Sequence, residues 1–307
     1  EASIVITTRN RREDLRTALR SCLAQTARPE VLVIDDGSND GTADMVRAEF
    51  PSVRLDRSET SMGLIVQRNR GAQLARGQII FSIDDDAAFS TPRVVEQTLA
   101  DFCHPRIGAV AIPFIDVNRE PGRLKQSPPD PDRVYLADTY IGTAHAVRRD
   151  VFLAVGGYRG QLVHQGEEGD FCLRMLDAGW VVRLGTADPI HHFESPRRSY
   201  ARMDYYGHRN PILLMGQNVP MPWVLWRIAR FVAAGLVFGL RVGRPRNVWL
   251  GLLDGCLGLL QRILRRKPVS AEVYRLYRQL KGRALSLDEV MSRLPPVRTS
   301  AACGHPS

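Results

Sequence analysis

The stretch Ile79 to Phe89, IIFSIDDDAAF, organises the interpretation of this chain. Its first residues suit a buried strand, which runs directly into three consecutive carboxylates, Asp84, Asp85 and Asp86. Three adjacent negative charges repel one another, and a divalent cation with oxygen ligands is the natural remedy. A solvated acidic turn is the simpler explanation of an isolated DDD, so the surrounding sequence has to decide between the two.

The net charge of the chain is unevenly distributed. The 307 residues carry a formal charge of +9, with apolar and charged fractions typical of a folded globular protein. From Met221 onward there are fifteen Lys and Arg against four Asp and Glu, so this third carries +11 and residues 1–220 carry −2. A nucleic-acid-binding core needs basic residues across its folded surface, so we expect no nucleic-acid partner. The excess of positive charge therefore implies an anionic partner for the C-terminal third of the chain only.

The cysteines and the N-terminal residues bear on the compartment. The five cysteines are widely scattered, without a CxxC pair or a zinc-like spacing, which favours a reducing compartment. The opening residues EASIVITT contain no basic and then apolar leader, so we expect no secretory signal peptide.

Strands and helices alternate in the N-terminal part of the chain. Residues 3–7 predict a strand, residues 12–25 an amphipathic helix and residues 31–34 a second strand, which is followed by a turn-rich loop and a further helix. This order predicts an α/β fold with a mostly parallel sheet flanked by helices.

Polar side chains follow the predicted strands at their carboxyl ends. Thr7 and Arg9 end the first strand, and Asp36 ends the second, as Asp84 to Asp86 end a later one. Ligands of open parallel sheets collect at this edge. Two acidic clusters on the same edge are more economically explained by one bound ligand that contains a cation than by two solvated turns.

Three segments in this order resemble the successive blocks of the family 2 glycosyltransferases: SIVITTRNR, QTARPEVLVIDDGSNDGT and MGLIVQRNRGAQLARGQIIFSIDDDAAF. The similarity covers roughly residues 3–215. The resemblance implies the GT-A fold and an inverting transferase. Such an enzyme moves a sugar from a nucleoside diphosphate donor, here a UDP- or dTDP-sugar, to a hydroxyl.

The resemblance also implies a donor site. Asp84 would lie near the ribose or on the metal, and Asp86 would bind the metal, Mn²⁺ or Mg²⁺. The role of Asp85 is ambiguous, because this chain has three consecutive aspartates where the D-x-D pattern of the family needs two. Asp36 matches the position that accepts a hydrogen bond from the pyrimidine ring, although it also suits a turn or helix cap. Arg68 could pair with phosphate oxygens or lie on the surface. Thr7 and Arg9 would complete the nucleotide site.

A second acidic centre occurs in the segment GEEGDF. An inverting transfer is an in-line displacement, so a base must take the acceptor proton opposite the leaving diphosphate. The first turn of a predicted helix contains Glu167, Glu168 and Asp170. Favourable interaction with the helix dipole would account for one or two of these carboxylates without a catalytic role. The family usually has Glu-Asp where this chain has Glu-Glu. The resemblance therefore implies Glu168 as base, with Glu167 and Asp170 as runners-up.

A histidine pair follows the predicted strand 181–184. Neutral imidazole can ligate a cation, but alternation along a strand directs His191 and His192 to opposite faces, so we expect at most one to serve and slightly prefer His192. The basic aromatic segment with Arg197, Arg198 and Tyr200 could close over the diphosphate or face lipid.

The part from residue 216 to residue 294 has a different character. Two apolar segments, Trp223 to Leu240 and Val248 to Leu264, are flanked by arginines, and neither has the roughly twenty clean apolar residues of a membrane span. Apolar faces, Trp anchors and dense arginine predict amphipathic helices on an anionic membrane surface. The alternative is a helical appendage packed on the catalytic domain or on a second subunit of a homo-oligomer. Residues 295–307 are expected to be disordered.

The sequence therefore predicts a GT-A catalytic domain over residues 1–215 with a basic, amphipathic helical extension. We expect a peripheral enzyme on the cytoplasmic face of the cell membrane, which extends a cell-envelope glycan or a lipid-linked acceptor. A retaining sugar transferase or a nucleotidyltransferase on a similar nucleotide-binding sheet is the alternative. The acidic segment at the helix start favours an inverting base over both.

Overall fold

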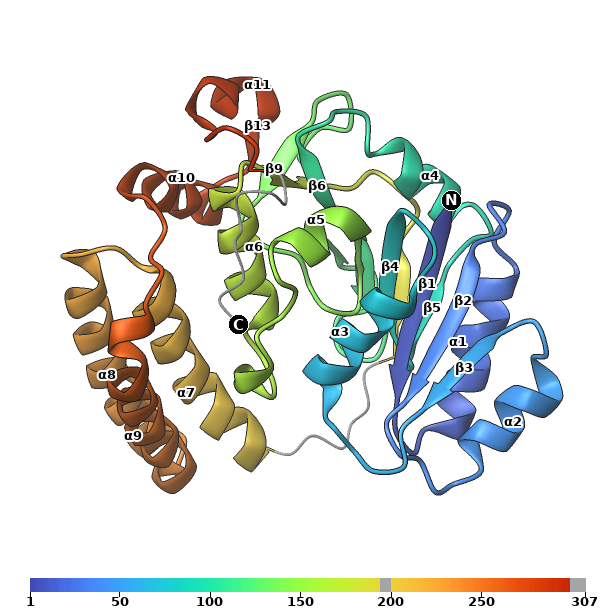
Figure 1. Ribbon diagram of the computed structural model, residues 1–307, viewed down its shortest axis with the longest axis horizontal. Coiled ribbons are helices and arrows are strands. Elements are labelled where there is room, and N and C mark those ends of the chain that lie inside the picture. The colour runs from blue at the N-terminus through green and yellow to red at the C-terminus, as the bar shows by residue number, and fades with distance from the viewer. Residues whose placement is uncertain (194–199, 299–307) are drawn as a thin grey trace.

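The β-branched segments of the chain form the strands of a central sheet (Figure 1). The computed structural model describes residues 1–193 and 200–298. The first half of the sheet is parallel, with the strand order β4-β1-β2-β3, and consists of β1 (Ala2–Thr8), β2 (Glu30–Asp35), β3 (Arg54–Arg57) and β4 (Ile79–Asp84). All residues of β1 are buried because helices cover both faces. These helices are α1 (Arg12–Leu23), α2 (Thr42–Glu49) and α3 (Leu64–Leu74).

The second half of the sheet is mixed. Strand β10 (His145–Arg148) lies antiparallel between β4 and β6 (Ile107–Ala111), and β11 (Val181–Leu184) continues parallel to β6. Two short strands, β9 (Tyr135–Ala137) and β13 (Leu285–Ser286), complete the edge. The helices of this half are α4 (Val94–Ala100), α5 (Arg149–Ala154) and α6 (Glu167–Asp177), with the 3₁₀ turn η1 (Gly160–Leu162).

A separate four-stranded sheet assembles segments that lie far apart in the sequence. Its order is β5-β12-β7-β8, with β5 (Ala87–Phe89), β12 (Ile190–His192), β7 (Phe114–Asp116) and β8 (Leu124–Lys125). The sequence predicts one strand over residues 108–114 and, from its prolines and its lack of periodicity, a long loop over residues 116–133. The structure has two strands in two sheets instead, and the segment predicted as a loop contains β8. Pairing of β12 with both β5 and β7 brings His192 beside the end of the DDD segment.

The C-terminal helices lie beside the sheet, where the first three pack on one another, the fourth packs on α6 and the last on β13 (Figure 1). They are α7 (Tyr200–Asn218), α8 (Trp223–Arg241), α9 (Pro245–Arg262), α10 (Ala271–Gly282) and α11 (Leu287–Val290), with the 3₁₀ turns η2 (Ile263–Arg265) and η3 (Met291–Arg293). The close crossing of helices α7 and α9 requires glycine at position 251, because a Cβ atom there would overlap the carbonyl oxygen of Tyr205. Asp254 accepts hydrogen bonds from the Tyr205 hydroxyl at 2.7 Å and from Arg209 Nε at 2.5 Å, which join the same two helices.

Two expected boundaries fall inside described structure. The domain boundary at residue 215 lies within α7, which packs mainly on α9. The tail expected from residue 295 begins with described residues, since Pro295 O accepts a hydrogen bond from Arg106 Nη2 at 2.8 Å and Arg298 pairs with Asp177. Residues 299–307, and Arg197 and Arg198 of the basic aromatic segment, lie outside the described residues.

Helices α8 and α9 expose many large apolar side chains. Burial of α8 is confined to Val224 and two glycines, and that of α9 to a few positions toward α7. The length and composition of α8 would allow it to cross a membrane, with a mean hydropathy of 1.5, but one such helix is a weak indication by itself. We call the following exposed side chains the apolar surface: Leu225, Trp226, Leu236, Val237, Phe238, Leu240, Trp249, Leu250, Leu253, Leu257 and Leu260.

Candidate active site

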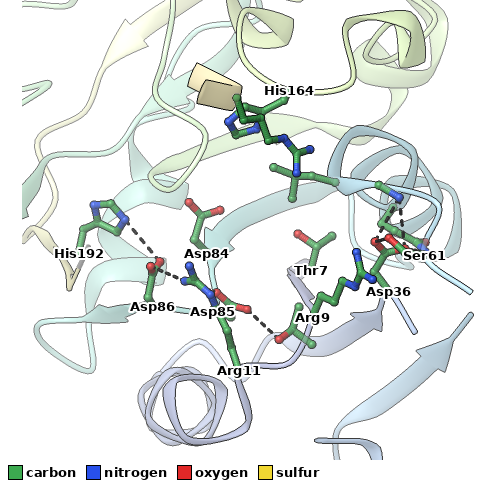
Figure 2. Close-up of a pocket in the computed structure, with 15 residues that line it drawn as sticks. Thr7, Arg9, Arg11, Asp36, Ser61, Asp84, Asp85, Asp86, His164 and His192 are labelled. Atoms are coloured by element: carbon green, nitrogen blue, oxygen red, sulfur yellow. Dashed lines mark hydrogen bonds and ion pairs between the residues drawn. The ribbon is translucent and has the colours of Figure 1, made fainter. Parts of the chain in front are cut away.

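A cavity of about 470 Å³ opens where β1, β2 and β4 end (Figure 2). The strands are in register, so Thr7 lies beside Asp84 and Thr8 beside Asp35. The prediction that the strand-end residues meet at one edge is confirmed. Among the predicted site residues, those that line the cavity are Thr7, Arg9, Asp36, Asp84, Asp85, Asp86 and His192.

Three side chains at one end of the cavity can hold a metal ion. Ligand atoms of Asp84, Asp86 and His192 lie within 4.8 Å of one another, and His192 Nε2 lies 3.4 Å from Asp86 Oδ1 (Figure 2). His192 Nδ1 donates to Asp116 Oδ1 at 2.6 Å, which orients the ring with Nε2 toward the cluster. Two carboxylates and one oriented imidazole suit a divalent cation such as Mn²⁺ or Mg²⁺.

The protonation of this cluster is set by its own contacts. Burial lowers the pKa of His192, but hydrogen bonds to Asp86 and Asp116 raise it to about 9. Burial raises the pKa of Asp86, but the His192 and Arg11 contacts lower it to about 2. A cation in the cluster would therefore displace the His192 proton on binding.

Arg11, which the sequence analysis did not select, holds the DDD segment. Its Nη1 atom lies 2.6 Å from Asp86 Oδ2 and 3.2 Å from Asp85 Oδ1. Asp85 also accepts a hydrogen bond from the Thr8 hydroxyl at 2.8 Å, and burial raises its pKa to about 7. Asp85 is thus engaged by β1 and by Arg11, and it lies outside the three-residue cluster.

Asp36 organises one wall of the cavity. Its carboxylate accepts hydrogen bonds from the Ser61 hydroxyl at 2.6 Å, Met62 N at 2.6 Å and Gln67 Nε2 at 2.7 Å (Figure 2). Burial raises the pKa of Asp36, but these hydrogen bonds lower it overall. Since a carboxylate has about four acceptor positions, a pyrimidine N–H has to share this group with the Ser61–Gly63 loop.

Arg68 joins the metal cluster to the second acidic centre. This guanidinium is buried, with its side chain 6% exposed, so it is not a surface arginine. Arg68 Nη2 lies 2.8 Å from Asp84 Oδ1, while Nη1 lies 3.1 Å from Glu167 Oε1 and 3.5 Å from Glu168 Oε1. One positive group therefore lies between three carboxylates from two distant segments.

The surroundings of Glu168 suit a general base. Burial raises its pKa to about 8, the charge of Glu167 acts in the same direction, and Arg68 opposes both. Glu167 is almost fully buried, whereas the Glu168 side chain remains 19% exposed. A Cβ atom at Gly142 would lie 2.5 Å from Glu168 Oε1, so this glycine leaves room for the carboxylate. A carboxylate with a pKa near the working pH is an effective proton acceptor.

Two of the alternative candidates have other roles in the structure. Asp170 is fully buried, and its oxygens accept from Arg159 at 2.6 Å, Asn218 at 2.7 Å and Arg174 at 2.9 Å. It cannot reach an acceptor hydroxyl without breaking these bonds. His191 lies outside the metal cluster and contacts Phe193, with ring centroids 6.4 Å apart.

Several residues around the cavity were not predicted from the sequence. Arg11 and Ser61 both lie in loops, without any sequence pattern that marks them. Asp116 is an acidic residue at the end of a strand, β7, as Asp84 is at the end of β4. The sequence instead predicts that it begins the loop over residues 116–133. His164 lies at the opposite side of the cavity from β1 (Figure 2), and Arg202 also lines the cavity. Both come from segments with no link to the DDD run in the sequence.

Comparisons with known proteins agree with this geometry. The glucosyl-dolichyl phosphate glucuronosyltransferase of Haloferax volcanii is 30% identical over 229 residues, which are 67% of this chain and 70% of that protein. Among solved structures, the mannosyltransferase PcManGT of Pyrobaculum calidifontis, in complex with GDP-Man and Mn²⁺, has a TM-score of 0.56 at 16% identity and covers 86% of both chains. S. aureus TarS 1–349 in complex with UDP-GlcNAc has a TM-score of 0.58 at 16% identity and covers 92% of this chain and 87% of that one.

These neighbours share the GT-A fold, and their complexes contain nucleotide-sugar donors. The family model described as glycosyl transferase family 2 matches residues 3–162, more than half of the 307 residues. This chain therefore belongs to glycosyl transferase family 2 and is a glycosyltransferase with the GT-A fold.

Proposed function

We propose that this protein is an inverting glycosyltransferase that moves a sugar from a UDP- or dTDP-sugar to a hydroxyl of a glycan or lipid-linked acceptor. The contact that carries the proposal is the Arg68 bridge, because it places Glu168 one guanidinium group away from Asp84 of the metal cluster. A displacement needs a stabilised leaving group on one side of the sugar and a base on the other. The closeness of Glu168 to the Asp84 cluster supports this assignment of the two roles.

Each residue of the site has a role in this proposal. Asp84, Asp86 and His192 would hold Mn²⁺ or Mg²⁺, and a cation bound there would supply positive charge to stabilise the leaving diphosphate. Arg11 holds Asp86 in place, and Thr7 and Arg9 line the cavity beside the nucleotide. Glu168 takes the proton of the acceptor hydroxyl as the new bond to the sugar forms. The single displacement inverts the anomeric carbon.

The helical part of the chain supports a peripheral position on the membrane. The apolar surface of α8 and α9 is too extensive for an ordinary solvated face and has many arginines beside it. Such a surface suits insertion of side chains into the interface of an anionic bilayer. We place the enzyme on the cytoplasmic face, with a lipid-linked acceptor. The name of the Haloferax relative, which refers to glucosyl-dolichyl phosphate, supports that acceptor class.

The first experiment tests the donor and the metal. The purified 307-residue chain is titrated with UDP-, dTDP- and GDP-sugars, with and without Mn²⁺, in a binding assay. We expect metal-dependent binding of a uridine or thymidine donor, which Asp86→Ala should weaken by more than tenfold because one charged ligand is lost. Metal-independent binding, or an unchanged affinity in Asp86→Ala, would remove the metal assignment.

The second experiment tests the base and the stereochemistry. Glu168→Gln should abolish transfer while nucleotide binding survives, since the amide cannot accept the proton. Glu272→Gln, an exposed carboxylate in the first turn of α10, is the matched control and should transfer at the wild-type rate. Full turnover by Glu168→Gln would exclude this base. A product that retains the anomeric configuration of the donor would exclude the inverting mechanism.

A further inference from the structure

A second cavity, separate from the active site, lies between α8 and α10 in the helical part of the chain. Its volume is about 720 Å³, and Met215 of α7 contributes to its lining. The two helices meet where the rings of Trp223 and Tyr274 pack, with centroids 5.8 Å apart. We call this cavity the α8–α10 groove. No residue of the nucleotide cavity contributes to it.

The charge of the groove is uniformly positive. Arg227 and Arg230 come from α8, and Arg275 and Arg278 from α10, while no carboxylate is among the lining residues. Within residues 1–193 and 200–298, none of these four guanidinium groups forms an ion pair with a carboxylate. Arg68 and Arg174, by contrast, are both paired in the catalytic domain. Four unneutralised charges around one cavity favour an anionic ligand, and the planar guanidinium matches phosphate oxygens.

A buried hydroxyl in the groove also lacks a hydrogen-bond partner. Tyr274 is only 4% exposed, and among the residues that the structure describes its hydroxyl makes no hydrogen bond of normal geometry. Burial raises the pKa of this hydroxyl, and the nearby Arg227 guanidinium opposes that rise. A buried polar group without a partner is costly, so such groups are commonly satisfied by a ligand or by ordered water. A phosphate oxygen in the groove would accept this proton.

Aromatic rings hold two of the arginines in orientation. The Arg275 guanidinium lies over the Trp223 ring, 5.4 Å from its centroid, and that of Arg227 lies 5.9 Å from the centroid of Tyr274. These contacts restrict the two side chains before any ligand arrives, which lowers the entropy cost of binding an anion.

The rim of the groove continues into the apolar surface. Trp226 lines the groove and is 68% exposed, and the adjacent Leu225 is 64% exposed. A ligand that is anionic at one end and apolar at the other fits this continuity, because its chain can leave the groove along α8. A free phosphate uses the arginines and Tyr274 but leaves the rim without a role.

We infer that the α8–α10 groove binds the phosphate of a membrane lipid. The four arginines and the Tyr274 hydroxyl bind the head group, and the apolar chain extends along the exposed side of α8 into the bilayer. This inference rests on the proposed membrane association and deepens it, since it replaces diffuse attraction to negative charge by a defined site for one phosphate.

The experiment uses the 307-residue chain in a vesicle co-sedimentation assay. Phosphatidylcholine vesicles are compared with vesicles that also contain phosphatidic acid. Tyr274→Phe keeps the charge and removes the hydroxyl, so it should weaken binding to the phosphatidic acid vesicles about tenfold and leave binding to phosphatidylcholine unchanged. Its thermal stability should stay the same or rise, because the lost hydroxyl has no partner. A merely structural role for the hydroxyl would lower the stability.

A matched pair of arginine variants separates a site from diffuse charge. Arg230→Gln with Arg278→Gln removes two exposed groups of the groove. Arg241→Gln with Arg246→Gln removes two exposed groups at the other end of the α8–α9 hairpin. We expect the groove pair to weaken binding to phosphatidic acid vesicles at least tenfold more than the control pair. Equal losses in the two pairs would overturn the site.

Two further outcomes distinguish the source of the phosphate and the underlying proposal. Inorganic phosphate that quenches Trp223 and Trp226 fluorescence and blocks vesicle binding at physiological concentration would assign the groove to free phosphate and overturn the lipid. Binding to phosphatidylcholine vesicles without any gain from phosphatidic acid would overturn the groove while the membrane association stands. Absence of binding to both vesicles would overturn the membrane association as well.

Discussion

Replacement of Glu167 by Gln is the sharpest test of the second acidic centre. The Oε1 atoms of Glu167 and Glu168 lie 3.1 and 3.5 Å from the same atom, Arg68 Nη1, so they are at most 6.6 Å apart. Two negative charges at that separation repel by about 2.5 kcal/mol at an effective dielectric constant of about 20. Removal of the Glu167 charge should therefore lower the pKa of Glu168 by about 2, since 1.36 kcal/mol corresponds to about one pKa unit.

The pH dependence of kcat/KM reports this change, because Glu168 must be deprotonated to act. With the pKa at about 8, the deprotonated fraction in the free enzyme rises about tenfold between about pH 7 and pH 9. In Glu167→Gln the acidic limb should move to about pH 6, so that kcat/KM is almost flat over the same interval.

The assay measures initial rates with Mg²⁺ under substrate concentrations well below KM. Glu272→Gln serves as the control, because this carboxylate is exposed on α10 and should leave the limb near pH 8. A wild-type limb at pH 5, or the same limb in wild type and Glu167→Gln, would refute the assignment of Glu168 as a base whose pKa is raised by its neighbour.

Three further predictions concern the same group of charges. Arg68→Ala should lower the free energy of unfolding by about 3–5 kcal/mol, measured by urea denaturation, because three carboxylates lose their common partner; a loss below about 1 kcal/mol would contradict a buried ion network. Glu168→Gln should raise Tm relative to wild type above about pH 8 and lose that advantage below about pH 4.5, because a carboxyl whose folded pKa is raised costs stability as pH rises through this interval; a pH-independent difference in Tm would argue against the raised pKa. Gly142→Ala should reduce kcat at least tenfold with little change in donor affinity, because the new Cβ displaces the ends of Glu168 and Arg68; wild-type kcat would show that the position of the carboxylate tolerates this shift.

The parts of the fold that the sequence predicted share a local cause. Strands β1, β2 and β4 are continuous runs of buried β-branched residues, and the helix between β1 and β2 has apolar residues at helical spacing. The carboxylates at the strand ends follow from the same pattern. The prediction of one strand over residues 108–114 was wrong at its C-terminal end, where Phe114–Asp116 pairs with β12 and not with the central sheet. Such pairing is a long-range contact, which local propensity does not encode.

The helical part shows the same division. Periodicity and composition predicted the two apolar helices, their arginines and their exposed apolar side chains. They did not predict that glycines of α9 bring α7 into close contact, nor that Asp254, which interrupts the apolar run, joins these helices through Tyr205 and Arg209. Such pairings depend on which helix faces are brought together.

The sequence by itself determined the strand-end carboxylates, the Glu167–Glu168 pair and the separation of charge between the two parts of the chain. Only the tertiary structure decided which of these groups act together. The register of β12 against β5 and β7 places His192 rather than His191 in the three-residue cluster. Asp85 lies outside this cluster and accepts a hydrogen bond from Thr8 instead. Arg68 connects Asp84 with Glu168, which lies one hundred residues after Arg68 in the sequence. Local patterns specify which groups a chain offers, whereas distances between charges, and therefore their pKa values and ligands, arise only when distant segments pack.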